Sequence, residues 1–441
     1  MPMPGSTADV RAFRGEILDF VGDPATLGEI AWRHFADGVL LVRGGKVAAV
    51  GPAAAMLAAI PDGAVVADYR GKLILPGFVD THVHYAQTDM IASHGAQLLE
   101  WLEKYTFPAE ARFADPEHAR DVAEFFVAEL LRNGTTTAMV FATTHKVSVD
   151  AIFEAARARS MRVIAGKVLT DRNVPQAVRD TAESGYDDSR ALIEQWHGRE
   201  RLAYAVTPRF APTSTERQLD LCGRLLEEHP DVFLQSHVAE NLGEVAWVAE
   251  LYPWSRSYLD VYDHFGLLRE RAVYAHCIHL DAMDRKRMAD TGTAMSFCAT
   301  SNLFLGSGLF NLQAAHECGA RVGLGTDVGA GTTLSMLRTM EESYKVCQLA
   351  GQSLSPMQAF YLATLGGAAA LYLEDRIGNF DIGKEADFVV LDPKATPHLA
   401  RRMERTTTLA ERLFAFMIMG DDRAVHATHV LGALAHARAG G

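Results

Sequence analysis

Two patterns of apolar and polar positions divide the chain into a long middle region and two shorter ends. In the middle region, short apolar runs alternate with stretches of helical periodicity, which is typical of βα units and a parallel sheet. Helices are predicted over residues 116–132, 149–159, 215–228 and 334–349. Eight apolar runs have strand character: 77–84, 135–143, 162–170, 202–212, 232–239, 272–279, 293–300 and 321–328. Eight strand-then-helix repeats predict an α/β fold of the (β/α)8 (TIM) barrel type.

The two ends of the chain carry strand-like runs separated by turns. Near the N-terminus these runs are 14–20, 38–43 and 46–50, and Gly44-Gly45 between the last two indicates a hairpin turn. Near the C-terminus they are 386–391 and 413–419. We therefore predict a small β-sandwich domain built from both ends, residues 1–75 and 375–441, beside a barrel domain of residues 76–374.

The amino-acid composition limits which binding partners and which cellular compartment we expect for this protein. The 441 residues carry a net charge of -13 with scattered Lys and Arg, which argues against binding to nucleic acid and favours a small-molecule substrate. Five cysteines form no CxxC pair, as expected of reduced thiols in the cytoplasm. The sequence contains no apolar stretch of membrane-spanning length, so we expect no contact with a membrane.

Polar residues stand at the ends of several predicted strands, where a barrel gathers its catalytic groups. His82 and His84 end the first strand, and their spacing of two places both imidazoles on one face. The fifth strand contains His237, the sixth His276, and the eighth ends at Asp327. Any one of them could be an ordinary hydrogen-bonded core residue, but the set together predicts a metal site.

This order of residues resembles the amidohydrolase superfamily, and more closely its guanine deaminases. The segments that carry the closer resemblance are PGFVDTHVHYAQ (76–87), LLEWLEKYTFPAE (98–110), NGTTTAMVFATTH (133–145), VTPRFAP (206–212), QSHVAEN (235–241) and GLGTDVGAG (323–331). The chain departs from many relatives at Ala299, where they have proline. The resemblance implies hydrolysis of guanine to xanthine and ammonia, in purine catabolism or salvage, by a homodimeric enzyme.

The resemblance also implies a metal centre with one ion per chain. Two-metal members use a carbamylated lysine at the end of the fourth strand, and here that strand ends without one; Lys167 lies in the third strand. Zn2+ suits the imidazole and carboxylate donors, and Fe2+ remains an alternative. The implied ligands are His82, His84, His237 and Asp327, with His276 either a fifth ligand or the residue that orients the attacking water.

A deaminase needs a group that moves protons beside a water activated by the metal. Glu240 lies three residues after His237, and we expect it to carry a proton from the water to a ring nitrogen; the alternative is an acid at the start of the next helix. Asp327 and His276 complete the expected catalytic set. We expect Gln87, Arg209, Phe210 and His237 to contact the purine.

Leu98 to Trp101 are expected to form the wall of a lid, and no role is assigned to His145 or Lys167. Two other functions remain open. A different deaminase or a chlorohydrolase, acting on a related purine, pterin or triazine, would share the ligands and Glu240. A non-catalytic scaffold would keep the barrel, but it would have no reason to keep all of these groups.

Overall fold

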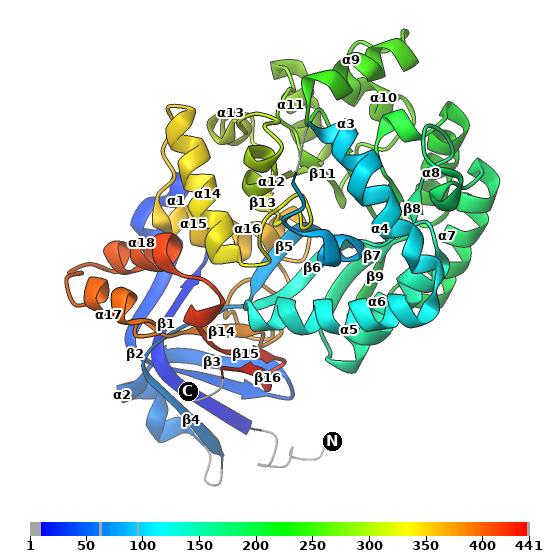
Figure 1. The fold of residues 1–441 in the computed structure, drawn as a ribbon. Helices are drawn as coiled ribbons and strands as arrows, with labels where there is room; N and C mark the ends of the chain where they lie inside the picture. The colour runs from blue at the N-terminus through cyan, green and yellow to red at the C-terminus, as the bar shows by residue number, and fades with distance from the viewer. Residues whose placement is uncertain (1–9, 61–63, 95–96, 439–441) are drawn as a thin grey trace.

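The computed structural model describes residues 10–60, 64–94 and 97–438 (Figure 1). Eight parallel strands form a barrel in its centre, and each predicted strand run contains one of them. A short strand, β8 (Val168–Leu169), pairs beside β9. The barrel strands are β5 (Phe78–His84), β6 (Thr135–Phe141), β7 (Arg162–Gly166), β9 (Leu202–Pro208), β10 (Phe233–Val238), β11 (Ala272–His276), β12 (Ala294–Phe297) and β13 (Val322–Leu324).

The first and last barrel strands meet through the residues that follow β13. The backbone N–H of Asp327 donates to the carbonyl of His82 at 2.9 Å, and that of His84 donates to Val328 at 2.8 Å. The buried carboxylate of Asp80 accepts from the backbone N–H of Thr326 at 3.0 Å. These bonds place Asp327 beside the two histidines of β5, although it is far away in the sequence.

Helices surround the barrel in Figure 1, and their apolar faces explain their positions. In α5, Asp115 caps the first turn, and Val122, Phe126 and Leu130 recur at helical spacing and are buried. The four predicted helices correspond to α5, α6, α8 and α14. The α-helices between the first barrel strand and residue 375 are α3 (Leu98–Trp101), α4 (Phe107–Ala111), α5 (Pro116–Arg132), α6 (Lys146–Ala158), α7 (Ala182–Trp196), α8 (Glu216–Glu228), α9 (Leu242–Leu251), α10 (Tyr258–His264), α11 (Ala282–Thr291), α12 (Ala299–Phe304), α13 (Leu312–Glu317), α14 (Met336–Leu349), α15 (Pro356–Leu362) and α16 (Leu365–Ala370).

The first βα loop is the long segment between β5 and α5. It contains α3, a π-helical turn at Leu102–Thr106, and α4. Trp101 and Phe107 from this loop pack with Phe210 in a small apolar cluster that is separate from the main core. This cluster holds the loop across the C-terminal ends of the barrel strands.

Strands from both ends of the chain form the separate β-domain that the sequence predicts. They make one continuous seven-stranded sheet in the order β16-β15-β14-β4-β1-β2-β3, in which only β1 and β4 run parallel. Gly44 and Gly45 both have positive φ in the turn between β2 and β3. The division of the chain at residues 75/76 and 374/375 stays a prediction. The strands are β1 (Val10–Phe20), β2 (Trp32–Arg43), β3 (Lys46–Pro52), β4 (Val65–Pro76), β14 (Phe388–Leu391), β15 (Val425–Val430) and β16 (Ala433–Ala437).

The prediction of a strand over 413–419 is wrong, because these residues belong to the helix α18 (Leu409–Met419). Thr408 and Glu411 form a capping box at its start, and Leu413, Phe416 and Met417 are buried at helical spacing. The last two strands lie in the polar stretch beyond it. Three other short helices accompany the sheet: α1 (Pro24–Leu27), α2 (Ala53–Met56) and α17 (Pro397–Met403). Among the described residues, no helix is both long and apolar enough to cross a bilayer.

Candidate active site

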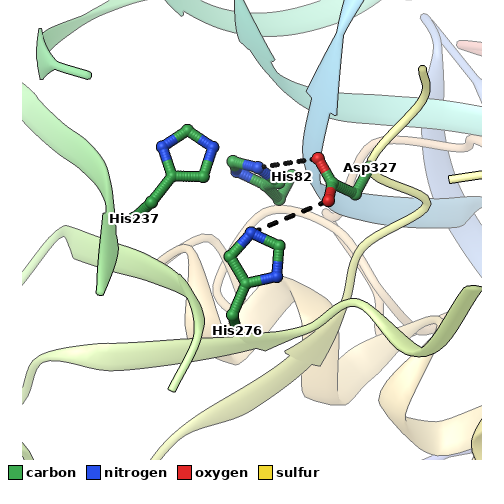
Figure 2. Close-up of side chains that lie close together, drawn as sticks. All are labelled: His82, His237, His276 and Asp327. Carbon is green, nitrogen blue, oxygen red and sulfur yellow. Dashed lines mark ion pairs between the residues drawn. The ribbon is translucent and has the colours of Figure 1, made fainter. Parts of the chain in front are cut away.

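Four of the predicted metal ligands meet at the C-terminal end of the barrel (Figure 2). Donor atoms of His82, His237, His276 and Asp327 all lie within 4.8 Å of one another. The fifth residue, His84, joins them: its Nε2 is 3.2 Å from Nε2 of His82 and 3.1 Å from Nε2 of His237. The structure therefore brings together all five residues that the sequence singled out from four different strands.

The spacing of these donor atoms fits a single divalent ion. Oδ1 of Asp327 lies 3.2 Å from Nε2 of His82 and 3.3 Å from Nε2 of His84. Two atoms that each bind one ion at about 2.0–2.1 Å lie roughly 3 Å apart. The observed separations are therefore those of neighbouring ligands around one centre.

The hydrogen bonds behind the histidines fix which ring nitrogen faces the centre. Nδ1 of His237 donates to the carbonyl of Arg209 at 2.6 Å, and Nδ1 of His276 donates to Oδ1 of Asn302 at 2.8 Å. Each Nε2 is then left with a lone pair directed at the cluster. Burial lowers the pKa of His84 to about 3 and that of His237 well below its usual value, which keeps both rings in the neutral form that binds metals.

Lys167 does not take part in this centre. Its Nζ pairs with the carboxylate of Asp180, and the side chain is buried beside β8 and β9, not among the metal-facing groups. His145 precedes α6 and is likewise absent from the residues that line the cavity. The donor set in the described residues is thus four imidazoles and one carboxylate, without a bridging lysine.

Glu240 lies beside this cluster and is almost completely buried. Its Oε2 is 3.4 Å from Nε2 of His276, and Oε1 accepts from the hydroxyl of Ser307 at 2.9 Å. Burial, reinforced by the nearby charge of Asp327, raises the pKa of Glu240 to about 8. A carboxyl group with a pKa near neutrality can both accept and release a proton at working pH.

The helix that follows Glu240 does not use it as a cap. Asn241 is the N-cap of α9, and Glu244 closes the capping box by accepting from the backbone N–H of Asn241 at 3.2 Å; the same carboxylate oxygen also accepts from the backbone N–H of Glu240 at 2.9 Å. Glu244 is fully buried, and Oε1 accepts from the hydroxyl of Tyr258 at 2.7 Å. We did not predict Glu244 as part of the site, although the Asn241-x-x-Glu244 pattern is a recognisable capping signal.

A cavity opens from the donor cluster, and all four residues expected to contact the purine line it. Gln87, Arg209 and His237 contribute polar atoms, and Phe210 contributes an aromatic face. Leu98, Trp101 and Leu102 from the first βα loop, together with Leu305 and Ala330, supply the rest of the apolar wall. This mixture of polar and apolar lining suits a partly polar ring system.

Arg209 is held by a buried acid that the sequence analysis missed. Nη1 of Arg209 donates to both carboxylate oxygens of Glu110, at 2.9 and 2.8 Å. Glu110 lies in the segment 98–110, but no spacing rule connects a residue of that loop with the end of the fourth barrel strand. Ala299 begins α12, is fully buried and lies outside both the donor set and the cavity lining.

The chain is similar in sequence to one known family and to several of its members. The model of the amidohydrolase family matches residues 73–435. The guanine deaminase of Escherichia coli K12 is 52% identical over 97% of this chain and 98% of its own length, and a probable guanine deaminase of Deinococcus radiodurans is 40% identical over 97% and 99%.

Solved structures agree with the sequence matches. The E. coli guanine deaminase structure has a TM-score of 0.95 and covers 97% of this chain and 100% of its own. A guanine deaminase from C. acetobutylicum with bound guanine in the active site has a TM-score of 0.87 at 29% identity, covering 96% and 99%. Triazine hydrolase from an Arthrobacter species, at 20% identity and a TM-score of 0.84, shares the fold.

Proposed function

This chain belongs to the amidohydrolase family and, within it, to the guanine deaminases, and on that premise we propose that it hydrolyses guanine to xanthine and ammonia with one divalent ion per chain. The observation that carries the proposal is the meeting of five strand-end donors with Glu240 in the cavity lined by Gln87, Arg209 and Phe210. The scaffold function is set aside, since the chain is a member of an enzyme family with these groups in place.

We propose that His82, His84, His237 and Asp327 hold the ion, and that it is zinc. When bound there, a divalent ion would lower the pKa of a water molecule toward ~7 and would so supply a nucleophile at neutral pH. His276 has its Nδ1 held by Asn302, so Nε2 is directed at the reacting atoms. In this proposal it orients the attacking water and the oxygen of the tetrahedral intermediate.

Glu240 moves the first proton in the proposed mechanism. It takes a proton from the attacking water and delivers it to the ring nitrogen next to C2, which makes C2 more electrophilic. Asp327 takes the second proton of the water and passes it to the exocyclic amine. The new C2–O bond then replaces the C2–N bond, and the amine leaves as ammonia.

The activity is tested by incubating purified protein with guanine, adenine, ammeline and 8-oxoguanine and measuring released ammonia. We expect guanine to have the highest kcat/KM and adenine to be turned over poorly. If the wild-type protein prefers a triazine or adenine, the proposed substrate is wrong, whereas the proposed deaminase chemistry is retained. A chlorohydrolase would instead release chloride from a chlorinated triazine.

The metal is tested by elemental analysis of the protein as purified. We expect one ion per chain, loss of activity on chelation, and recovery with Zn2+ in preference to Fe2+. Two ions per chain would contradict a mononuclear centre. We further propose that the enzyme is a cytoplasmic homodimer in purine catabolism or salvage, with its mass in solution measured by light scattering.

A further inference from the structure

Glu110 connects three parts of the molecule in the wall of the cavity. It lies in α4 of the first βα loop and is 1% exposed. Besides its two bonds from Arg209, it accepts from Nε2 of Gln87 at 3.1 Å. The guanidinium of Arg209 also lies over the ring of Phe107, with Cζ 5.4 Å from the centroid, so the same loop holds it from a second side.

These bonds decide which atoms Arg209 presents to the cavity. Nη1 is used by the carboxylate of Glu110. Among the described residues, no protein group accepts from Nε or Nη2, and Arg209 lines the cavity. Since guanidinium nitrogens only donate, the free part of the fork offers donors to a ligand.

The amide of Gln87 is oriented in the same way. Glu110 can only accept, so the nitrogen of the amide faces it, whereas the backbone N–H of Gly329 can only donate and binds Oε1 at 3.1 Å. The oxygen of Gln87 therefore already accepts a hydrogen bond from the protein, and the second N–H of the amide is available to a ligand. Without the carboxylate of Glu110, the hydrogen bond that holds the amide nitrogen of Gln87 on this side is lost.

Resting on the proposed function, we propose that Glu110 is a positioning residue that makes this wall a donor-only surface and so selects purines with an oxo group at C6. Guanine presents O6 and N7, which both accept, on one edge. Adenine presents N7 beside an amino group that donates, and two facing donors leave both unpaired. Glu110 acts through Arg209 and Gln87 and need not touch the substrate.

The other interpretation is that the pair of Glu110 and Arg209 only ties the loop to the barrel. In that case, loss of this pair would weaken the binding of all ligands to the same extent. Arg209→Ala does not separate the two interpretations, because it leaves the carboxylate of Glu110 buried and unpaired. Glu110→Gln is the better variant: it keeps the size and one acceptor, removes the charge, and adds donors that no longer impose the orientation of Gln87.

The test measures binding of hypoxanthine and adenine to the metal-loaded protein by calorimetry. Hypoxanthine shares O6 and N7 with guanine but lacks the amine that is hydrolysed. For Glu110→Gln we expect the Kd of hypoxanthine to rise about 10- to 100-fold, and that of adenine to change far less. The matched control is Glu103→Gln, which removes an exposed carboxylate from the same loop and should leave both constants unchanged.

Two further variants keep the test decisive. Glu110→Asp retains the negative charge, so it should keep more of the preference for hypoxanthine over adenine than Glu110→Gln does. It also tests the proposal if Glu110→Gln folds poorly. In a double variant with Arg209→Ala, the effect of Glu110→Gln on hypoxanthine binding should be much smaller than in wild type. Equal changes for both purines, or an undiminished preference in Glu110→Gln, would overturn the proposal. Failure of the proposed function would appear separately, as wild type releasing no ammonia from guanine.

Discussion

Charged and polar side chains are buried at both ends of the barrel, and the two groups have different partners. At the C-terminal ends of the strands, imidazole nitrogens and the Asp327 carboxylate face one another, as in the 3.1 Å approach of His84 to His237. At the N-terminal ends, Arg162 begins β7 and Arg201 precedes β9, and both face Glu385 of the β-domain. We call these groups the upper cluster (His82, His84, His237, His276, Asp327) and the lower cluster (Arg162, Arg201, Glu385, Asp387).

In the lower cluster each charge faces an opposite charge, and Arg201 and Asp387 make further hydrogen bonds. Arg201 bonds to Glu385 at 2.6 Å, pairs with Asp387, and donates to the carbonyl of Ser160 at 2.7 Å. Asp387 also accepts from the backbone N–H of Leu431 at 2.8 Å. Such a network needs no additional ligand, and it joins the bottom of the barrel to the sheet.

In the upper cluster, imidazole nitrogens and a carboxylate converge on one point, and their donor atoms lie within 4.8 Å of one another for His82, His237, His276 and Asp327. Nε2 of His84 lies 3.2 Å from that of His82 and 3.1 Å from that of His237, which is the spacing expected of ligands that share one cation. Burial of polar groups therefore does not by itself identify a functional site. The kinds of group that face one another do, since the lower cluster pairs opposite charges whereas the upper cluster gathers the donors of a possible metal site.

The largest expected effect is in the upper cluster. Asp327→Ala removes the one carboxylate of the donor set, so we expect the metal to be lost and kcat/KM for guanine to fall by at least ~10⁴-fold. Metal content, ammonia release and circular dichroism are measured together. Asp187→Ala, an exposed acid on α7, is the matched control. Retained metal and activity would show that Asp327 is no ligand.

The second prediction concerns the lower cluster. Arg201→Met leaves Glu385 and Asp387 short of a buried partner, and we expect the free energy of unfolding to fall by about 3–5 kcal/mol. Urea unfolding measures this loss. Activity per folded molecule should remain that of wild type, because the residue lies at the opposite end of the barrel from the metal centre. A changed kcat in fully folded protein would mean that the two ends are coupled.

The third prediction separates proton transfer from metal binding in the upper region. Glu240→Gln keeps the side-chain size but cannot carry a proton, so kcat should fall at least ~100-fold with metal content unchanged. Steady-state kinetics and elemental analysis provide the two measurements. Glu227→Gln, on the exposed side of α8, is the control and should behave as wild type. Loss of the metal in Glu240→Gln would make this residue a ligand.

The smallest effect is expected for the second arginine of the lower cluster. Arg162→Gln removes one of two arginines that face Glu385, while Arg201 stays in place. We expect a loss of only about 1–2 kcal/mol in the free energy of unfolding, with kinetics unchanged. Urea midpoints compare the two arginine variants directly. Equal losses for both would mean that the network breaks as a unit.

Local patterns in the sequence predicted most of the barrel. The strand-then-helix pattern can be recognised locally because short apolar runs alternate with helices such as α5 and α14, which are long enough to show the helical period. The prediction of a strand over 413–419 was wrong because this apolar run is too short to show which period it follows. Seven apolar residues in a row have the length of a strand, and only the capping box at Thr408 and Glu411 shows that they continue a helix.

The sequence by itself determined the fold class and the residues of the upper cluster, because strand ends in a parallel barrel meet at one face whatever the loops do. That rule was enough to bring His82, His84, His237, His276 and Asp327 together. The partners of Arg209 and Gln87 were decided only by the tertiary structure. Glu110 reaches them from a loop packed over the barrel mouth, and the path of such a loop depends on its packing against Phe210 and its neighbours, which no local periodicity encodes.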